Sequence, residues 1–138
     1  MSEVKLSDDY NLYIGRAASY LIILSLLHYD EEHSGYSLIK KIEKITYDKL
    51  KFRAGTIYPQ IEKLQEEGLI KRHIRDVPSR SEDIIRQKAV YSITEDGVRV
   101  LDQMCLEWDN LQGLIHKIIK GHFGVKNDKK YRNANREV

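Results

Sequence analysis

The chain has 138 residues, of which 41% are apolar and 32% charged, a balance that supports one folded domain and excludes a disordered or collagen-like chain. The single cysteine, Cys105, excludes an internal disulfide and a cysteine-rich zinc site. The longest apolar run, 20–27, is shorter than the roughly 20 residues that span a bilayer, and the amino terminus lacks a signal pattern. We therefore expect a soluble cytoplasmic protein without a membrane partner.

The net charge of +2 conceals a pattern along the chain. Residues 36–88 carry thirteen basic and eight acidic side chains, and residues 117–138 carry seven basic and two acidic ones. Residues 1–35 and 89–116 are instead acidic, each with a net charge of −4. The charges alone fit either surfaces that face a polyanion or a chance arrangement of solvated side chains.

The first half of the chain predicts three helices. After an arm over residues 1–9, the apolar stretch 10–28 predicts one largely buried helix. Ser34 is a good N-cap for a second helix over 35–45, whose inward stripe is Leu38, Ile42 and Ile45. A third helix runs from about 54 to 67, with Ile57, Ile61 and Leu64 facing inward, Pro59 in its first turn and Gly68 as its C-terminal cap.

The second half predicts two strands and a long helix. Residues 69–75 and 88–93 have the composition of strands, and the polar stretch 76–87 predicts a long loop between them. Thr94 caps the last helix, and apolar residues then recur at steps of three and four from Val98 to Ile118. The tail after that helix is polar and basic.

This order predicts a mainly α fold with a small β-hairpin, a winged helix-turn-helix with N- and C-terminal dimerisation helices. We expect a flexible arm over 1–9, a DNA-binding domain over 10–94, a dimerisation helix over 95–120 and a basic flexible tail over 121–138. In such a fold the third helix enters the major groove, and the loop between the strands reaches the neighbouring backbone or minor groove.

Four segments in this order resemble the PadR-type transcriptional regulators. They are Gly35-Tyr36-Ser37-Leu38-Ile39, Gly55-Thr56-Ile57-Tyr58-Pro59, the segment 64–70 (LQEEGLI) and the segment 91–97 (YSITEDG). The single helix after the hairpin is similar to the smaller class of that family. The resemblance implies a homodimer that regulates transcription from double-stranded DNA, and we expect a repressor that acts on an inverted-repeat operator.

The residues themselves indicate where DNA would bind. Thr56, Gln60 and Lys63 share one side of the third helix, and the Gln60 amide suits an adenine edge. The remaining candidates would contact phosphates or sugars from the helix starts and the preceding loop, or the DNA from the wing, where Arg80 suits a narrow minor groove and a solvated loop is the alternative. They are Tyr36, Lys40, Lys41, Arg53, Tyr58, Arg80, Arg86 and Lys88. An ordinary solvated helix face is the alternative for the third helix, and Tyr36 fits a core position equally well.

The last helix carries more apolar surface than one small domain covers, which predicts a second copy of the chain. The interface candidates are Leu12, Leu21, Ile22, Leu101, Cys105, Trp108, Leu111, Ile115 and Ile118. By the resemblance, Trp108 either stacks on a planar aromatic effector between subunits or packs in the dimer core.

The five histidines do not form a metal site, and the sequence holds no nucleophile–base motif or phosphate-binding glycine loop. We therefore expect no enzyme activity, no metal and no cofactor. The alternatives to a DNA-binding regulator are a winged-helix module that binds other proteins and a small-molecule sensor with weak DNA binding.

Overall fold

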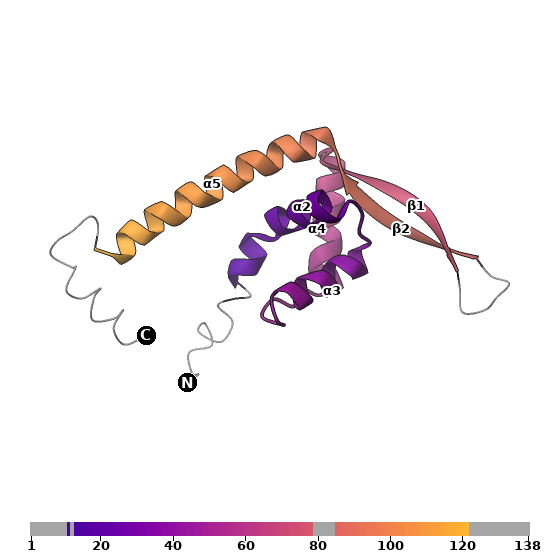
Figure 1. Cartoon of the computed structure of the whole chain (residues 1–138), viewed down its shortest axis with the longest axis horizontal. Helices are drawn as coiled ribbons and strands as arrows, with labels where there is room; N and C mark the ends of the chain where they lie inside the picture. The colour runs from indigo at the N-terminus through magenta and orange to yellow at the C-terminus, as the bar shows by residue number, and fades with distance from the viewer. Residues whose placement is uncertain (1–10, 12, 79–84, 122–138) are drawn as a thin grey trace. The chain divides into compact units, whose positions relative to one another are not determined.

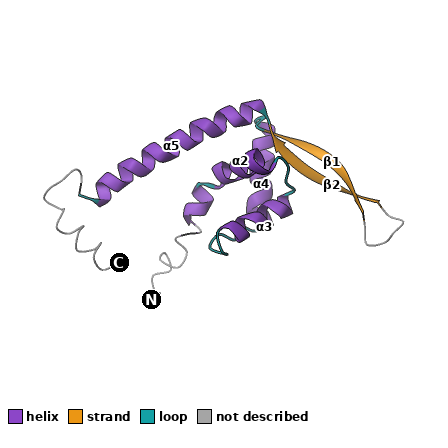
Figure 2. Ribbon diagram, viewed as in Figure 1, coloured by secondary structure: helices purple, strands orange, loops and turns teal. Residues whose placement is uncertain are grey.

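The computed structural model describes residues 11, 13–78 and 85–121. Its elements run in the order α2 (Ser19–Asp30), α3 (Gly35–Ile45), α4 (Ala54–Glu66), β1 (Ile70–Pro78), β2 (Ile85–Ile93) and α5 (Glu95–Ile119) (Figure 1). Helices carry most of these residues, and β1 and β2 form an antiparallel hairpin (Figure 2). This confirms the predicted fold of helices with a small β-hairpin. No helix in the described part combines the length and the apolar character needed to span a membrane.

The chain divides into two compact units after Leu101, so α5 begins in the first unit and ends in the second. The core of the first unit lies between α2, α3 and α4. Its largest fully buried apolar side chains are Ile23, Leu24, Leu27, Leu38, Ile57 and Ile61. Burial of each contributes about 1.5–3 kcal/mol to folding. The predicted inward stripe of α4 is confirmed, whereas Ile45 at the end of α3 is 53% exposed.

We expected one unbroken helix from the composition of the apolar stretch at the amino terminus, but the structure interrupts it. Residues 13–17 are helical, a turn follows at Ala18, and α2 begins at Ser19. The buried Ser19 hydroxyl donates to the carbonyl of Arg16 at 2.8 Å, a local bond that competes with regular helix geometry. Hydroxyl competition of this kind is not visible in the apolar pattern that predicted the helix.

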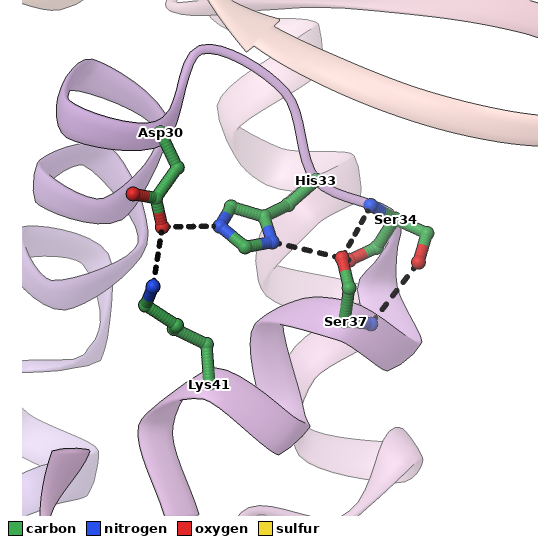
Figure 3. A network of polar contacts seen from close by, with 5 residues as sticks. All are labelled: Asp30, His33, Ser34, Ser37 and Lys41. Carbon is green, nitrogen blue, oxygen red and sulfur yellow. Dashed lines mark hydrogen bonds and ion pairs between the residues drawn. The ribbon is translucent and has the colours of Figure 1, made fainter. Parts of the chain in front are cut away.

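The start of α3 is fixed by a group of polar contacts (Figure 3). The predicted Ser34 cap is confirmed, because its hydroxyl accepts from the Ser37 amide at 3.0 Å and Ser37 Oγ accepts from the Ser34 amide at 2.9 Å. His33 Nε2 donates to Asp30 Oδ2 at 2.7 Å, and Nδ1 lies 2.8 Å from Ser37 Oγ. Lys41 Nζ lies 3.5 Å from the same Asp30 oxygen. The end of α2 is therefore bonded directly to the first turns of α3.

Helix α4 tolerates a proline in its interior. We expected Pro59 in the first turn, but α4 begins at Ala54, so Pro59 is in the second turn and leaves the Gly55 carbonyl without its usual partner. Both residues are exposed, so solvent can bond that carbonyl. The predicted cap at Gly68 is confirmed by its φ of 74°, a conformation that glycine adopts without strain.

The hairpin is longer than predicted. The stretch 76–87 is not all loop, because Asp76 pairs with Gln87, Val77 with Arg86 and Pro78 with Ile85. These outer pairs are mostly exposed, so the sequence there does not alternate apolar and polar residues as a half-buried strand does. Backbone hydrogen bonds extend the strands beyond that signal. Residues 79–84, which hold the predicted DNA contact Arg80, lie outside the described residues.

The start of α5 is joined to the loop before β1. The Thr94 hydroxyl caps α5 as predicted, accepting from the Gly97 amide at 3.0 Å, and it donates to the Gly68 carbonyl at 2.7 Å. Gly97 lies directly against the Leu69 carbonyl, which leaves no room for a side chain. The first turn of α5 therefore packs on the backbone that links α4 to β1.

This close approach predicts a large difference between two glycine substitutions in α5. A Cβ on Gly97 would overlap the Leu69 carbonyl oxygen and lie 2.6 Å from Ile93 Cγ1. Gly97→Ala should lower the free energy of unfolding by about 1–3 kcal/mol. Gly113→Ala, whose Cβ meets nothing within 4 Å among the described residues, should raise it by about 0.5–1 kcal/mol. Denaturant unfolding measures both, and equal effects would contradict the packing.

The contacts at the start of α3 predict an acid-dependent contribution to stability. The hydrogen bond from His33 lowers the pKa of the Asp30 carboxyl, and Lys41 adds a smaller effect in the same direction. A carboxyl with a lowered pKa stabilises the fold above its unfolded pKa, and this stability is lost as the pH falls through the folded value.

His33→Ala should therefore raise the pKa of Asp30 toward its ordinary value, and Lys41→Ala should raise it less. An NMR titration of the Asp30 carboxyl carbon measures both shifts. A larger rise in the Lys41 variant, or no rise in either variant, would contradict this account.

Candidate nucleic-acid interface

The predicted DNA contacts of α4 differ in the solvent exposure of their side chains. Thr56 and Gln60 are half-buried beside the inward stripe, and Lys63 is exposed with its Nζ 3.3 Å from Glu67 Oε2. Gln60 Oε1 is enclosed and has no hydrogen-bond partner among the described residues. We expected the Gln60 side chain to face outward, but it is only partly exposed. Its oxygen must leave this position to meet a base.

Tyr58 connects α4 to α3. A Cβ on Gly35, the first residue of α3, would lie 2.5 Å from the Tyr58 ring and 2.7 Å from its hydroxyl. The ring therefore covers the Gly35 backbone, while the residue remains 44% exposed. The two glycine- and tyrosine-containing segments of the sequence meet at this contact, which sets the spacing of the two helices.

The predicted contacts of α3 fall into two groups. Tyr36 is 64% exposed, and Lys40 Nζ lies 5.5 Å from the centre of its ring and 3.6 Å from Glu43 Oε1. Tyr36 is thus a surface residue and not a core aromatic. Lys41 is half-buried in the contacts with Asp30, so part of its charge is already balanced within the chain.

Arg53 is the N-cap residue of α4, and its exposed side chain makes no capping bond. Free amides at the first turn of a helix favour an anion, and the contact of Arg53 with a phosphate stays a prediction.

The hairpin brings four cations to one face. Residues paired across an antiparallel ladder lie on the same face, and successive residues along a strand alternate between faces. The register pairs Lys71 with Ser92, Arg75 with Lys88 and Val77 with Arg86, so all three pairs share one face. We call the exposed cations Lys71, Arg75, Arg86 and Lys88 the basic face. Lys71 and Arg75 were not predicted as DNA contacts, although their even spacing along the predicted strand indicates a shared face.

One ion pair connects the basic face to the helices. Arg75 Nη2 donates to Glu32 Oε2 at 2.5 Å, and Arg75 Nε lies 3.4 Å from Glu32 Oε1. The hydrogen bond from Arg75 lowers the pKa of the Glu32 carboxyl, and the same bond raises the pKa of Arg75. Both residues therefore remain charged at neutral pH.

The predicted dimer residues are mostly outside the core of the first unit. Cys105 is exposed and Trp108 half-buried, while Leu111, Ile115 and Ile118 are 53%, 47% and 64% exposed. Leu114 and Ile119 extend this stripe and were missed, because they lie one step off the regular spacing. Leu21 and Ile22 are half-buried, and Leu12 lies outside the described residues.

Leu101 differs from the other interface candidates because it is only 5% exposed in the single chain. It already belongs to the core of the first unit, so we remove it from the predicted interface.

No group of three potential metal ligands gathers among the described residues. Asp30, His33 and Ser37 form a carboxylate–imidazole–hydroxyl chain like that of a catalytic triad. The Ser37 oxygen, however, accepts a hydrogen bond from the Ser34 amide as part of the α3 cap. A nucleophile needs a free oxygen and a place for its substrate. This group therefore has a structural role.

Comparisons with known proteins agree with this geometry. Residues 23–103 match the model of the "Transcriptional regulator PadR-like family". The chain is 34% identical over 91 residues to the transcriptional regulator YqjI of Escherichia coli (strain K12); the match covers 66% of this chain and 39% of the length of that protein. The relative is thus much longer than the matched region.

Solved structures show the same fold. A transcriptional regulator from Clostridium thermocellum is 27% identical with a TM-score of 0.65, covering 75% of this chain and 95% of that one. A PadR family regulator from Eggerthella lenta has a TM-score of 0.72 at 23% identity, covering 84% and 94%. Bacillus subtilis PadR in complex with operator DNA is 26% identical with a TM-score of 0.50, covering 62% and 45%. This chain, with its helix pair, hairpin and long last helix, belongs to the PadR-like family of transcriptional regulators.

Proposed function

We propose that the chain is a sequence-specific repressor that binds double-stranded DNA as a homodimer on an inverted-repeat operator. The observation that carries this proposal is the pair of packed helices α3 and α4 beside a hairpin that gathers four cations on one face. The Bacillus subtilis relative, which shares this fold, was solved on operator DNA. A regulator bound to an operator excludes other proteins from that stretch of DNA, so we propose repression.

Helix α4 is the proposed reading helix. Its apolar side is fixed in the core by Ile57, Ile61 and Leu64, so its opposite side faces outward with Gly55 and Pro59. A helix of this size fits the major groove of B-DNA. Gln60 reads a base once its side chain turns out of its enclosed position, where its oxygen has no hydrogen-bond partner among the residues that the structure describes.

Phosphate contacts supply most of the affinity in this proposal. Lys40 and Tyr36 lie together on α3, Arg53 is at the start of α4, and Arg86 and Lys88 are on the basic face. Each is exposed, so each can approach the DNA backbone without breaking the core. Thr56, Tyr58, Lys41, Lys63 and Arg80 remain further candidates.

The last helix supplies the proposed dimer contact. Single-chain burial leaves Leu111, Ile115 and Ile118 about half exposed or more, together with Leu114 and Ile119. Successive residues of an α-helix are rotated by about 100° around its axis, so these residues share one side of α5 with Trp108. A second copy that covers this stripe with its own gives a twofold dimer. The effector role of Trp108 stays a prediction.

The reading role of α4 predicts different losses for two variants. Gln60→Ala should reduce the preference for the operator over an unrelated duplex by about 1–3 kcal/mol, because it removes a base contact. Lys40→Ala should weaken binding to both duplexes equally and reduce the slope of log K against log salt by about one. Fluorescence anisotropy titrations across salt concentrations measure both variants. If Gln60→Ala weakened both duplexes equally, the base-reading role would be wrong.

The dimer role of α5 predicts different oligomeric states for two leucine variants. Leu111 is 53% exposed on the apolar stripe, and Leu106 is 55% exposed about 140° away around the same helix. Leu111→Glu should raise the dimer dissociation constant by about 100-fold or more, because each subunit loses one apolar side chain from the contact and places a carboxylate there. Leu106→Glu should leave it nearly unchanged. Sedimentation equilibrium distinguishes these results, and equal effects, or a monomeric unsubstituted chain, would contradict the proposed interface.

A further inference from the structure

The basic face of the hairpin contains a repulsive pair. Arg75 and Lys88 are directly opposite each other in the ladder, and their side chains share one face. Like charges in such positions destabilise a hairpin. The next pair toward the tip, Val77 and Arg86, adds another cation to this face. The face therefore favours an anion beside Arg75.

The chain itself supplies that anion. Glu32 comes from the turn between α2 and α3, and its two carboxylate oxygens approach Arg75 Nη2 and Nε. The turn is held at the base of the hairpin by its backbone, because His33 and Tyr91 exchange N–H···O bonds of 3.1 and 2.8 Å. The Glu32 carboxylate is thus positioned by a backbone bridge, independently of its own ion pair.

A carboxylate and a phosphate present similar pairs of oxygens to the arginine fork. Glu32 is 37% and Arg75 50% exposed, so solvent reaches their ion pair. Exposed pairs of this kind contribute little to stability, about 0–1 kcal/mol. A DNA phosphate, placed among the other cations of the basic face, can therefore displace the Glu32 carboxylate without unfolding the turn.

We propose that Arg75, beside Lys88, is a binding site for a DNA phosphate that the Glu32 carboxylate occupies in the free protein. This inference rests on the proposed function. Glu32 lowers the affinity for every duplex, because Arg75 must leave it before it binds DNA. The freed carboxylate then lies near the DNA and takes up a cation from solution, which makes the salt dependence shallower.

The test compares two neighbouring glutamates. Glu31 is exposed and adjacent to Glu32, so Glu31→Gln removes the same charge without touching Arg75. Binding to a duplex of random sequence is measured by fluorescence anisotropy at several salt concentrations, after circular dichroism has shown that the variants are folded. Glu32→Gln should bind about three- to tenfold more tightly, with a salt slope steeper by up to about one. Glu31→Gln should change both quantities much less.

A second variant assigns the effect to Arg75. In an Arg75→Gln background, Glu32→Gln should no longer change the salt slope, because the phosphate site is gone. An equal gain from Glu31→Gln, or a gain that persists without Arg75, would overturn the proposal. So would a loss of affinity in Glu32→Gln, because that would show that the ion pair only holds the hairpin in place. If the unsubstituted chain bound no duplex even at low salt, the proposed function and this inference would both fail.

Discussion

The arrangement of the first unit depends on the short turn between α2 and α3. Within residues 30–34, Asp30 and His33 connect the end of α2 to α3, and Ser34 caps α3. The His33 backbone bridges to β2, and Glu32 reaches β1 through Arg75. Each contact is modest by itself, since hydrogen bonds contribute about 1 kcal/mol net. Because they share one turn of backbone, together they fix α3 and the hairpin relative to α2.

The same turn connects stability to the proposed function. Helix α3 is held against α4 by Leu38 in the core and by the Tyr58 ring over Gly35. The exposed side of α4 and the basic face of the hairpin are therefore parts of one packed body. A DNA-binding surface made this way would keep the proposed phosphate and base contacts in a fixed relation, which would reduce the ordering that binding requires. In the same turn, Glu32 balances one cation of the basic face through its ion pair with Arg75.

Local rules predicted the features that neighbouring residues determine. Ser34, Gly68 and Thr94 were identified as caps because a cap needs only a side chain or a φ value at one position. Contacts between distant residues were not predictable in this way. Glu32 and Arg75 are 43 residues apart in the sequence, and no local pattern pairs them. The Tyr58 ring over Gly35 likewise depends on how α3 and α4 pack, which periodicity does not specify.

We propose that two copies pair through α5 and present two α4 helices to adjacent major grooves. A hydroxyl-radical footprint of the full chain, on a duplex selected from a random pool, tests this most directly. We expect an inverted-repeat site with two symmetric protected regions whose centres lie about one helical turn, roughly 34 Å, apart. A single protected region on a sequence without twofold symmetry would contradict it.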